Sequence, residues 1–450
     1  MNLPDAFLSQ MQEILGGELP DFLQSLSQLA PVSIRLNPSK SSSISFEKNN
    51  PVAWHPAGFY LPERPIFTFD PIFHAGAYYV QEASSMFIFE ALRQAVDLSK
   101  PLKILDLCAA PGGKTTLLLS ATSPESFVLA NEVIRTRLPV LRLNLEKWGY
   151  PNAAVSSLDS SEFSRLKGFF DVVLVDAPCS GEGLFRKDEG AVREWSENNV
   201  RLCAARQQRI LSDACELVKP GGILLYSTCT FNVLENENNV AWMLERFDLE
   251  EVKLSIPANW GVAEEKMGYQ FYPHRVRGEG FFLAVLKRKA GDDFRMKTAP
   301  AGSEKKLDRK LLETLAPWIE TPESLSFQVF ETGEVIALPA IHAETARILQ
   351  QSLKKCTAGT QMGYLKKKDF VPSHALALSN LMRKDFSAVE MSREQALRFL
   401  KKETPDLPGL EKGWHLARFG SLNLGWMKVL DNRINNYLPN EWRIRMDLPE

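Results

Sequence analysis

The chain has 450 residues, of which 44% are hydrophobic and 24% charged, and its 53 Lys and Arg residues nearly balance 55 Asp and Glu. These values exclude a disordered or fibrous chain and favour a globular protein of about two to four domains. No apolar run reaches the ~18 residues of a membrane span, and the N-terminus lacks the order of a signal peptide, so we expect a cytoplasmic protein with no membrane partner.

Residues 1–65 are predicted to form a small N-terminal module. Apolar spacing predicts helices at residues 7–15 and 22–29. The segment VSIRLNPSK, which begins at Val32, predicts a strand that ends at Pro38 ahead of a serine cluster.

Short apolar runs alternate with helical segments from residue 100 to 290, within a domain that we place at residues 66–290. This alternation predicts an α/β fold with a doubly wound parallel sheet. The expected strands cover residues 103–107, 127–131, 171–178, 223–231 and 281–288, with a further strand-like piece in 153–159. The expected helices cover residues 113–121, 135–148, 200–218 and 235–246, and Lys219-Pro220-Gly221-Gly222 predicts a stop and a tight turn.

The C-terminal part is predicted to hold two further units. Residues 291–304 are small and polar and are expected to be a linker. Residues 305–370 mix helical and strand-like patterns and predict a small α+β domain, whereas the short aromatic-rich runs of 371–450 favour a β-rich domain. The last hundred residues carry 17 basic and 11 acidic side chains, which suits a nucleic-acid backbone as well as a solvated surface.

A turn of small residues follows the first strand of the predicted sheet directly. It reads Cys108-Ala109-Ala110-Pro111-Gly112-Gly113-Lys114. Small residues let the backbone approach a ligand, and the N-terminus of the next helix offers free N–H groups. The Walker A pattern fails because Cys108 stands where it needs glycine, and the dinucleotide-binding pattern is absent. The turn therefore predicts a site for a small polar ligand.

Acidic residues follow three successive strands of the same sheet. Glu132 follows the second strand, where a carboxylate accepts hydrogen bonds from a ribose diol. Asp159 follows the third, in reach of an adenine amino group, and Asp176 ends the fourth. A helix cap is the alternative for any one of them. Three such residues at successive strand ends favour a cofactor site.

Two cysteines are predicted to meet at the carboxyl edge of this sheet. Cys179 and Cys229 stand just past the fourth and fifth strands, beside the small-residue turn. A thiol there suits nucleophilic attack on an electron-poor ring carbon. Cys108, Cys203 and Cys215 fit the commoner role of a small buried hydrophobe. The six cysteines form no C-x-x-C pair, so we expect neither a disulfide framework nor a metal.

Taken together, these motifs resemble the NOP/SUN family of RNA cytosine-5 methyltransferases, in particular its bacterial RsmF type. The matching segments are QEASS at 81–85, LDLCAAPGGKTT at 105–116, NE at 131–132, LD at 158–159, VDAPCSGEGLFRK at 175–187 and YSTCTF at 226–231. The resemblance implies a Rossmann-like class I methyltransferase domain, S-adenosylmethionine as the methyl donor, an RNA-binding N-terminal module, and a PUA-like RNA-binding domain at 371–450.

The same resemblance implies a role for individual residues. Cys229 would add to carbon 6 of cytosine, Cys179 would help to remove the proton from carbon 5, and Asp176 would hydrogen-bond the ring. The cofactor would lie against Cys108, Ala109, Ala110, Pro111, Gly112, Gly113, Lys114, Glu132, Arg137, Asp159 and Asp176. The candidate RNA contacts are Arg35, Asn37, Arg186 and Lys187. For each of them, an ion pair at the protein surface is an equally good alternative.

The favoured prediction is an enzyme that methylates carbon 5 of cytosine in 16S ribosomal RNA, in the small subunit or its precursor. Transfer RNA is the runner-up substrate. A ribosome-assembly factor that binds RNA without methylating it is a different class of function, but RNA binding alone needs neither thiol. A small-molecule methyltransferase is a third class, and it would need no basic tail.

Overall fold

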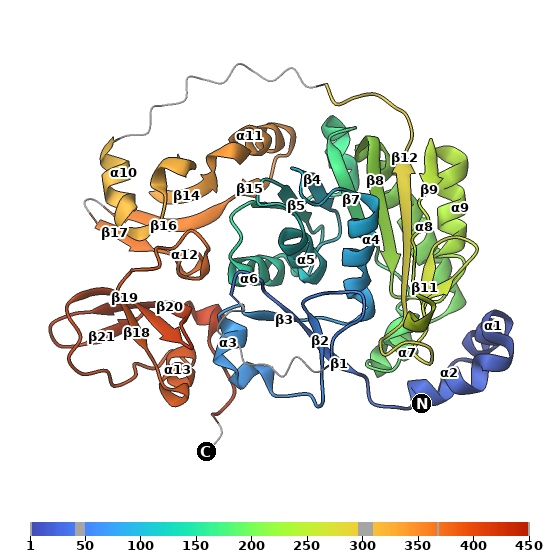
Figure 1. Cartoon of the computed structure of the whole chain (residues 1–450), viewed down its shortest axis with the longest axis horizontal. Helices are drawn as coiled ribbons and strands as arrows, with labels where there is room; N and C mark the ends of the chain where they lie inside the picture. The colour runs from blue at the N-terminus through green and yellow to red at the C-terminus, as the bar shows by residue number, and fades with distance from the viewer. Residues whose placement is uncertain (1, 41–49, 296–308, 367–368, 449–450) are drawn as a thin grey trace.

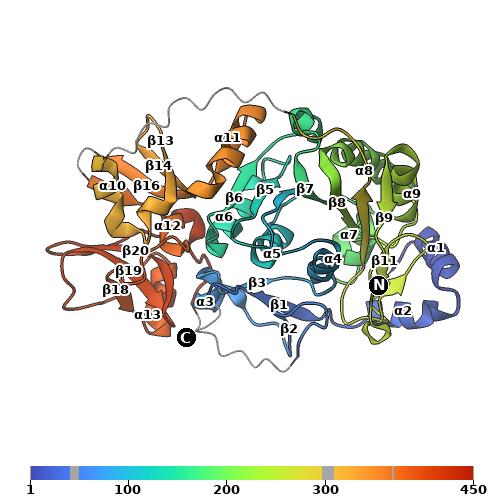
Figure 2. The same ribbon diagram turned by 45° about the horizontal axis from the view of Figure 1, so that its top comes forward.

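The structure is a computed structural model that describes residues 2–40, 50–295, 309–366 and 369–448. In two views the helices nearest the N-terminus lie at one end of the molecule and the C-terminal sheets at the other, with a large sheet between them (Figures 1 and 2). Residues 296–304, most of the predicted linker, lie outside the described residues.

The central sheet has the strand order β10-β11-β12-β8-β7-β4-β5-β6-β15, and β9 pairs with β12. Its strands are β4 Lys103–Asp106, β5 Phe127–Asn131, β6 Ala153–Ser156, β7 Phe170–Asp176, β8 Val218–Thr228, β9 Leu249–Glu251, β10 Ala263–Glu264, β11 Tyr269–Phe271, β12 Phe281–Arg288 and β15 Cys356–Ala358. The Rossmann-like fold class is confirmed, with β4 to β8 parallel in the order 8-7-4-5-6.

The predicted parallel sheet also carries antiparallel strands towards both edges. β12 runs antiparallel to β8, and β15 runs antiparallel to β6. The residues of β12 from Phe281 to Leu286 are buried on both faces. A continuous apolar run of this kind looks the same in sequence whichever way the strand runs.

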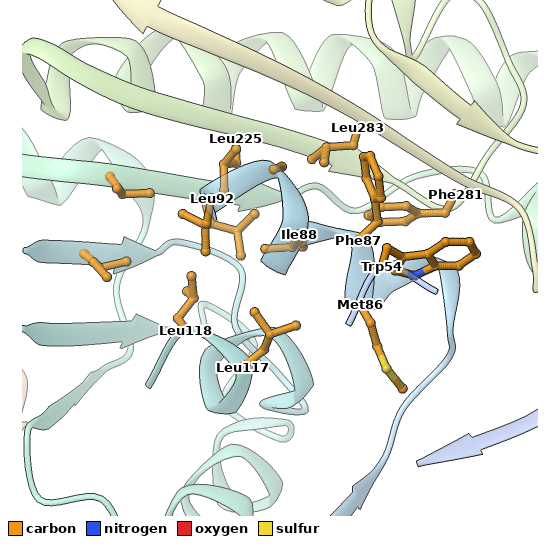
Figure 3. Close-up of a cluster of buried hydrophobic side chains, with 14 of the residues drawn as sticks. Trp54, Met86, Phe87, Ile88, Leu92, Leu117, Leu118, Leu225, Phe281 and Leu283 are labelled. Carbon is orange, nitrogen blue, oxygen red and sulfur yellow. The ribbon is translucent and has the colours of Figure 1, made fainter. Parts of the chain in front are cut away.

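Helices cover the central sheet on both faces. The helices of this region are α4 Ile88–Ala95, α5 Gly113–Ala121, α6 Leu138–Trp148, α7 Glu189–Glu194, α8 Glu197–Leu217 and α9 Glu237–Arg246. Alternate strand residues separate two cores: Leu225 and Leu283 pack with α4 and α5, whereas Leu224 and Tyr226 pack with α8 and α9. Figure 3 shows the first of these cores, where Leu117 and Leu118 of α5 face Leu225.

The predicted stop after α8 is present, but the turn after it belongs to a strand. α8 ends at Leu217, and β8 already includes Lys219 to Gly222. Gly221 has a φ of 76°, and the pairing of β7 with β8 shifts register between Phe170 and Val172. The Pro-Gly-Gly segment is therefore an irregular start to β8.

The N-terminal segments form two separate parts. Helices α1 Asp5–Leu15 and α2 Leu19–Leu26 pack against Phe185, Trp195 and Phe231, near the loops that follow β7 and β8. Strands β1 Val32–Leu36, β2 Gly58–Leu61 and β3 Tyr78–Val80 form an antiparallel sheet that crosses the predicted boundary at residue 65.

The C-terminal region contains two four-stranded sheets. Its strands are β13 Leu325–Val329, β14 Glu334–Pro339, β16 Thr360–Lys366, β17 Asp369–Pro372, β18 Ala388–Glu390, β19 Gly413–Phe419, β20 Leu422–Val429 and β21 Ile434–Asn436. The remaining α-helices are α3 Pro71–His74, α10 Arg309–Leu315, α11 Ala343–Ser352, α12 His374–Leu378 and α13 Arg393–Leu400. One core joins both sheets, since Trp318 and Phe370 pack with Leu416 and Trp426. None of the helices in the described ranges is long and apolar enough to span a bilayer.

Candidate active site

The candidate site lies where β4, β5, β7 and β8 end. These four strands are neighbours in the sheet and run parallel, so the segments that follow them meet at one edge. Figure 1 shows α5, which follows β4, between the sheet and the N-terminal strands. The motifs that the sequence singled out thus lie on adjacent loops.

The small-residue turn leads directly into α5. Gly112 precedes the helix with a φ of 111°, a conformation that favours glycine. A Cβ added at Gly113 would lie 3.1 Å from the Tyr79 ring. The Asn144 amide donates a 2.8 Å hydrogen bond to the Pro111 carbonyl and holds the turn against α6. Close packing therefore requires small residues here.

Glu132 and Arg137 both bind the backbone of Ala110 in this turn. The Glu132 carboxylate is buried and accepts hydrogen bonds from the backbone N–H groups of Ala110, at 3.3 Å, and Ile134, at 2.8 Å. The Arg137 guanidinium donates to the Ala110 carbonyl at 2.6 Å and lies 3.5 Å from Glu132. The two predicted cofactor residues are brought together with the turn.

Asp159 is a helix cap, which was the alternative to a cofactor contact. It begins the 3₁₀ helix Ser160–Leu166, accepts a hydrogen bond from the Ser161 N–H at 3.2 Å, and pairs with Arg209 of α8 at 2.9 Å. The side chain of Asp159 remains 35% exposed. Its proposed contact with an adenine stays a prediction.

Lys114 and Asp176 link the turn to the end of β7. The Lys114 Nζ atom lies 2.7 Å from Asp176 Oδ2, and the Ser227 hydroxyl donates to the other carboxylate oxygen at 2.8 Å. Burial alone would lower the pKa of Lys114, but the adjacent Asp176 carboxylate raises it above its usual value. Lys114 is therefore a fixed positive charge at this edge.

The two predicted catalytic cysteines are in contact. The Sγ atoms of Cys179 and Cys229 lie 3.1 Å apart, and the Cys229 N–H points at the Cys179 sulfur at 3.3 Å. Both are free thiols and partly exposed. The contact with Cys229 and then burial raise the pKa of the Cys179 thiol well above its usual value. One thiol thus has a second sulfur within hydrogen-bonding reach.

Of the three cysteines predicted to be small buried hydrophobes, two are buried. Cys203 and Cys215 of α8 are buried, and burial raises the pKa of both thiols. Cys108 is partly exposed in the turn, and its thiol pKa is also raised by burial.

Three buried carboxyl groups around the site were not predicted from the sequence. Glu182 and Glu235 are fully buried in the loops after β7 and β8, and Asp106 at the end of β4 accepts a 2.6 Å hydrogen bond from Thr115. Burial raises the pKa of Asp106 and of Glu235 to about 7. All three lie inside or beside the family motifs, and this position is the only sign of them in the sequence. Their burial depends on distant segments.

The structure corrects the expectation for Arg35 and Asn37. Both are fully buried beneath the N-terminal sheet. Arg35 donates to the Thr116 hydroxyl at 2.6 Å and stacks on Trp148, while Asn37 donates to the Trp148 carbonyl at 3.0 Å. They anchor this sheet to α5 and α6, so neither side chain is available to RNA.

Arg186 is likewise internal, whereas Lys187 reaches the surface. The Arg186 side chain is 4% exposed and lies 3.0 Å from the buried Glu279 carboxylate. Lys187 lies 3.2 Å from the other Glu279 oxygen but is 35% exposed. The expectation of RNA contact is corrected for Arg186 and stays a prediction for Lys187.

Among the residues that the structure describes, no group of three or more His, Cys, Asp or Glu side chains is placed to hold a metal ion.

Family models match three segments of the chain. Residues 94–287 match 16S rRNA methyltransferase RsmB/F, residues 3–83 match the N-terminal domain of 16S rRNA methyltransferase RsmF, and residues 386–444 match the RsmF PUA domain. The matches follow one another in the order of the chain.

Curated relatives match nearly the whole chain. Ribosomal RNA small subunit methyltransferase F of Aliivibrio fischeri is 30% identical, and that of Vibrio parahaemolyticus 31%, each over 98% of this chain and 97% of the relative. The protein of that name from Cronobacter sakazakii is 36% identical, but the matched segment spans 64% of each chain, less than two thirds of the relative.

Solved structures share the fold. A methyltransferase homolog protein from Pyrococcus horikoshii is 29% identical with a TM-score of 0.55, over 63% of this chain and 95% of that one. NSun6 from Pyrococcus horikoshii, solved with SFG, has a TM-score of 0.53 at 20% identity, over 64% of this chain and 99% of that one, which shows the fold alone.

Proposed function

Because the chain belongs to the RsmF family of ribosomal RNA small subunit methyltransferases, we propose that it transfers a methyl group from S-adenosylmethionine to carbon 5 of a cytosine in 16S ribosomal RNA. The observation that carries this reaction is the 3.1 Å contact between Cys179 and Cys229 beside the Lys114–Asp176 pair. Addition to a pyrimidine ring needs a nucleophile, and this sheet edge places one beside a second thiol and a fixed charge.

The small-residue turn and its acidic neighbour fit the methyl donor. S-adenosylmethionine carries a ribose diol, and the buried Glu132 carboxylate at the end of β5 suits its hydroxyl groups. Its other contacts would be the turn from Cys108 to Lys114, with Asp159, Arg137 and Asp176 around it. When bound, the donor supplies an electrophilic methyl group.

Cys229 starts the reaction as the nucleophile. Its thiolate forms a bond to carbon 6 of cytosine, and the electron pair of the 5,6 double bond moves to carbon 5. Carbon 5 then takes the methyl group, whose bond to the sulfur of the donor breaks and leaves a neutral thioether. Asp176, held by Lys114 and Ser227, hydrogen-bonds the ring and favours the addition.

Cys179 completes the reaction. As its thiolate, Cys179 takes the proton from carbon 5, the electron pair of that C–H bond restores the 5,6 double bond, and the bond between carbon 6 and Cys229 breaks. Cys229 leaves as the thiolate with which it began, and the Cys179 thiol then gives its proton to water, so atoms and electrons balance. The Cys179 sulfur lies beside the Cys229 sulfur, which supports this order of steps.

The substrate base must leave its stack to reach the thiols. Such access favours a single-stranded or distorted segment of RNA, in the small subunit or its precursor. Bisulfite sequencing of ribosomal and transfer RNA, from cells with and without the gene, tests reaction and substrate together. We expect the loss of a protected cytosine in 16S ribosomal RNA, restored by the wild-type gene but not by Cys229→Ala.

The other outcomes separate the alternatives. A cytosine lost from transfer RNA keeps the mechanism and replaces the substrate. If no cytosine changes in either RNA, the proposal fails and the assembly-factor function takes its place.

A further inference from the structure

We propose that Glu235 is a positioning residue that holds Cys179 in reach of Cys229, because it fixes the Ser180 backbone directly and the Pro178 backbone through Gln207. The inference rests on the proposed function, in which Cys179 releases the methylated base.

Glu235 binds the loop after β7 directly. Its side chain is fully buried, and its Oε2 atom accepts a hydrogen bond from the Ser180 N–H at 3.0 Å and another from Gln207 Nε2 at 2.7 Å. Gln207 Nε2 also donates to the Pro178 carbonyl at 3.1 Å. The residues on either side of Cys179 are therefore held by one carboxylate and one amide.

Gln207 is itself fixed in orientation. Its Oε1 atom accepts a hydrogen bond from Asn239 Nδ2 at 2.8 Å, and the Tyr226 hydroxyl, which donates to the Glu235 backbone carbonyl at 2.5 Å, lies 3.2 Å away. Tyr226, Gln207 and Asn239 are all fully buried. Because the Asn239 amide donates to the oxygen end of Gln207, the Gln207 NH₂ group faces the two acceptors, the Pro178 carbonyl and Glu235.

The network joins the loops of both cysteines. Glu235 comes from the segment after β8, six positions beyond Cys229, yet it binds the loop that carries Cys179. A hydroxyl contact of 3.0 Å between Ser180 and Thr230 lies on the same side. A shift of Ser180 would therefore change the distance between the two sulfur atoms, to which proton transfer is sensitive.

A single oxygen of Glu235 makes both contacts. In the part of the chain that the structure describes, its Oε1 atom is buried without a hydrogen-bond partner. The amide oxygen of a glutamine can take the place of Oε2 and accept from the same two donors. Glu235→Gln should therefore keep the loop in place, whereas Glu235→Ala leaves the Ser180 N–H without its acceptor.

The test measures turnover of the full-length protein with S-adenosylmethionine and 16S ribosomal RNA from cells that lack the gene. Covalent protein–RNA adducts are followed on denaturing gels, with Cys179→Ala as the reference. We expect Glu235→Ala to lower kcat by about tenfold or more and to accumulate the adduct. The KM for S-adenosylmethionine should stay within about twofold, and Glu235→Gln should restore turnover to within about threefold.

Glu237→Ala is the matched control. Glu237 is a partly buried glutamate two positions further on, and burial raises its pKa to about 7 as well. No hydrogen bond joins its side chain to residues 178–180 in the described structure. This variant should turn over like the wild type and form no excess adduct.

Two results would overturn the inference while leaving the proposed function intact. In the first, Cys179→Ala traps the adduct but Glu235→Ala, folded by circular dichroism, turns over normally. In the second, Glu235→Ala and Glu235→Gln lose activity equally and neither accumulates adduct. If Cys179→Ala gives no adduct and Cys229→Ala still methylates, the proposed mechanism has failed; if the wild type methylates no cytosine, the proposed function itself has failed.

Discussion

Cys179 and Cys229 are 50 positions apart in the chain, yet their Sγ atoms lie 3.1 Å from each other. The cause is the parallel pairing of β7 with β8, which sets Asp176 opposite Ser227. Each cysteine stands two or three residues past one member of this pair, so the two loops leave the sheet side by side.

The two cysteines should give different defects. Cys229→Ala removes the nucleophile and should abolish methylation, whereas Cys179→Ala should methylate once and remain joined to its RNA. Denaturing gels with labelled RNA distinguish a free protein from an adduct. Full activity of Cys229→Ala would refute the assignment of the nucleophile.

Lys114→Met should slow the chemical step. It leaves the Asp176 carboxylate without the cation that now lies 2.7 Å away. We expect a fall of about a hundredfold in the single-turnover rate. Lys114→Arg keeps the charge and serves as the control. Equal rates for Lys114→Met and the wild type would contradict this role.

Arg35→Met should lower stability rather than RNA affinity. Arg35 donates to Gln81 at 2.7 Å and to Thr116 at 2.6 Å in a fully buried setting. Removal leaves these acceptors unpaired, and we expect a loss of about 2–4 kcal/mol in the free energy of unfolding. Urea titration measures this loss. The exposed Arg433→Met is the control, with no expected change in stability.

His374 should make the protein sensitive to acid. Burial, together with Lys147, Lys40 and His74, lowers the pKa of His374 from 6.5 to about 3. A lowered pKa in the folded state means that its contribution is fully present above pH 6.5 and is lost as the pH falls towards 3, because only the unfolded chain takes up the proton.

His374→Phe removes this proton and can retain an aromatic contact with Trp442, whose ring centroid lies 4.3 Å from that of His374. Relative to this variant, the wild type should lose about 1.4 kcal/mol per pH unit between about pH 6 and 4. Urea unfolding at three pH values measures the difference. Parallel pH profiles for the two proteins would exclude His374 as the cause.

The local pattern of apolar and small residues in the sequence determined the core strands, the helix at 113–121 and the loops that carry the site. Parallel strands such as β5 and β7 have continuous apolar runs because both their faces are buried, and α5 starts and ends at the predicted residues. The turn before it is also local, since a φ of 111° at Gly112 needs a glycine. The order of Cys179 and Cys229 after neighbouring strands then followed from sheet topology.

Only the tertiary structure decided what surrounds these segments. Sequence shows that Arg35 is charged, but not that α5 and α6 cover it. It places Glu235 near Cys229, but not beside Ser180, which a different strand presents. The sequence also did not show that β12 runs antiparallel to β8. Apolar periodicity reports which face of an element is buried, whereas the partner of a buried polar group depends on long-range packing that no local pattern encodes.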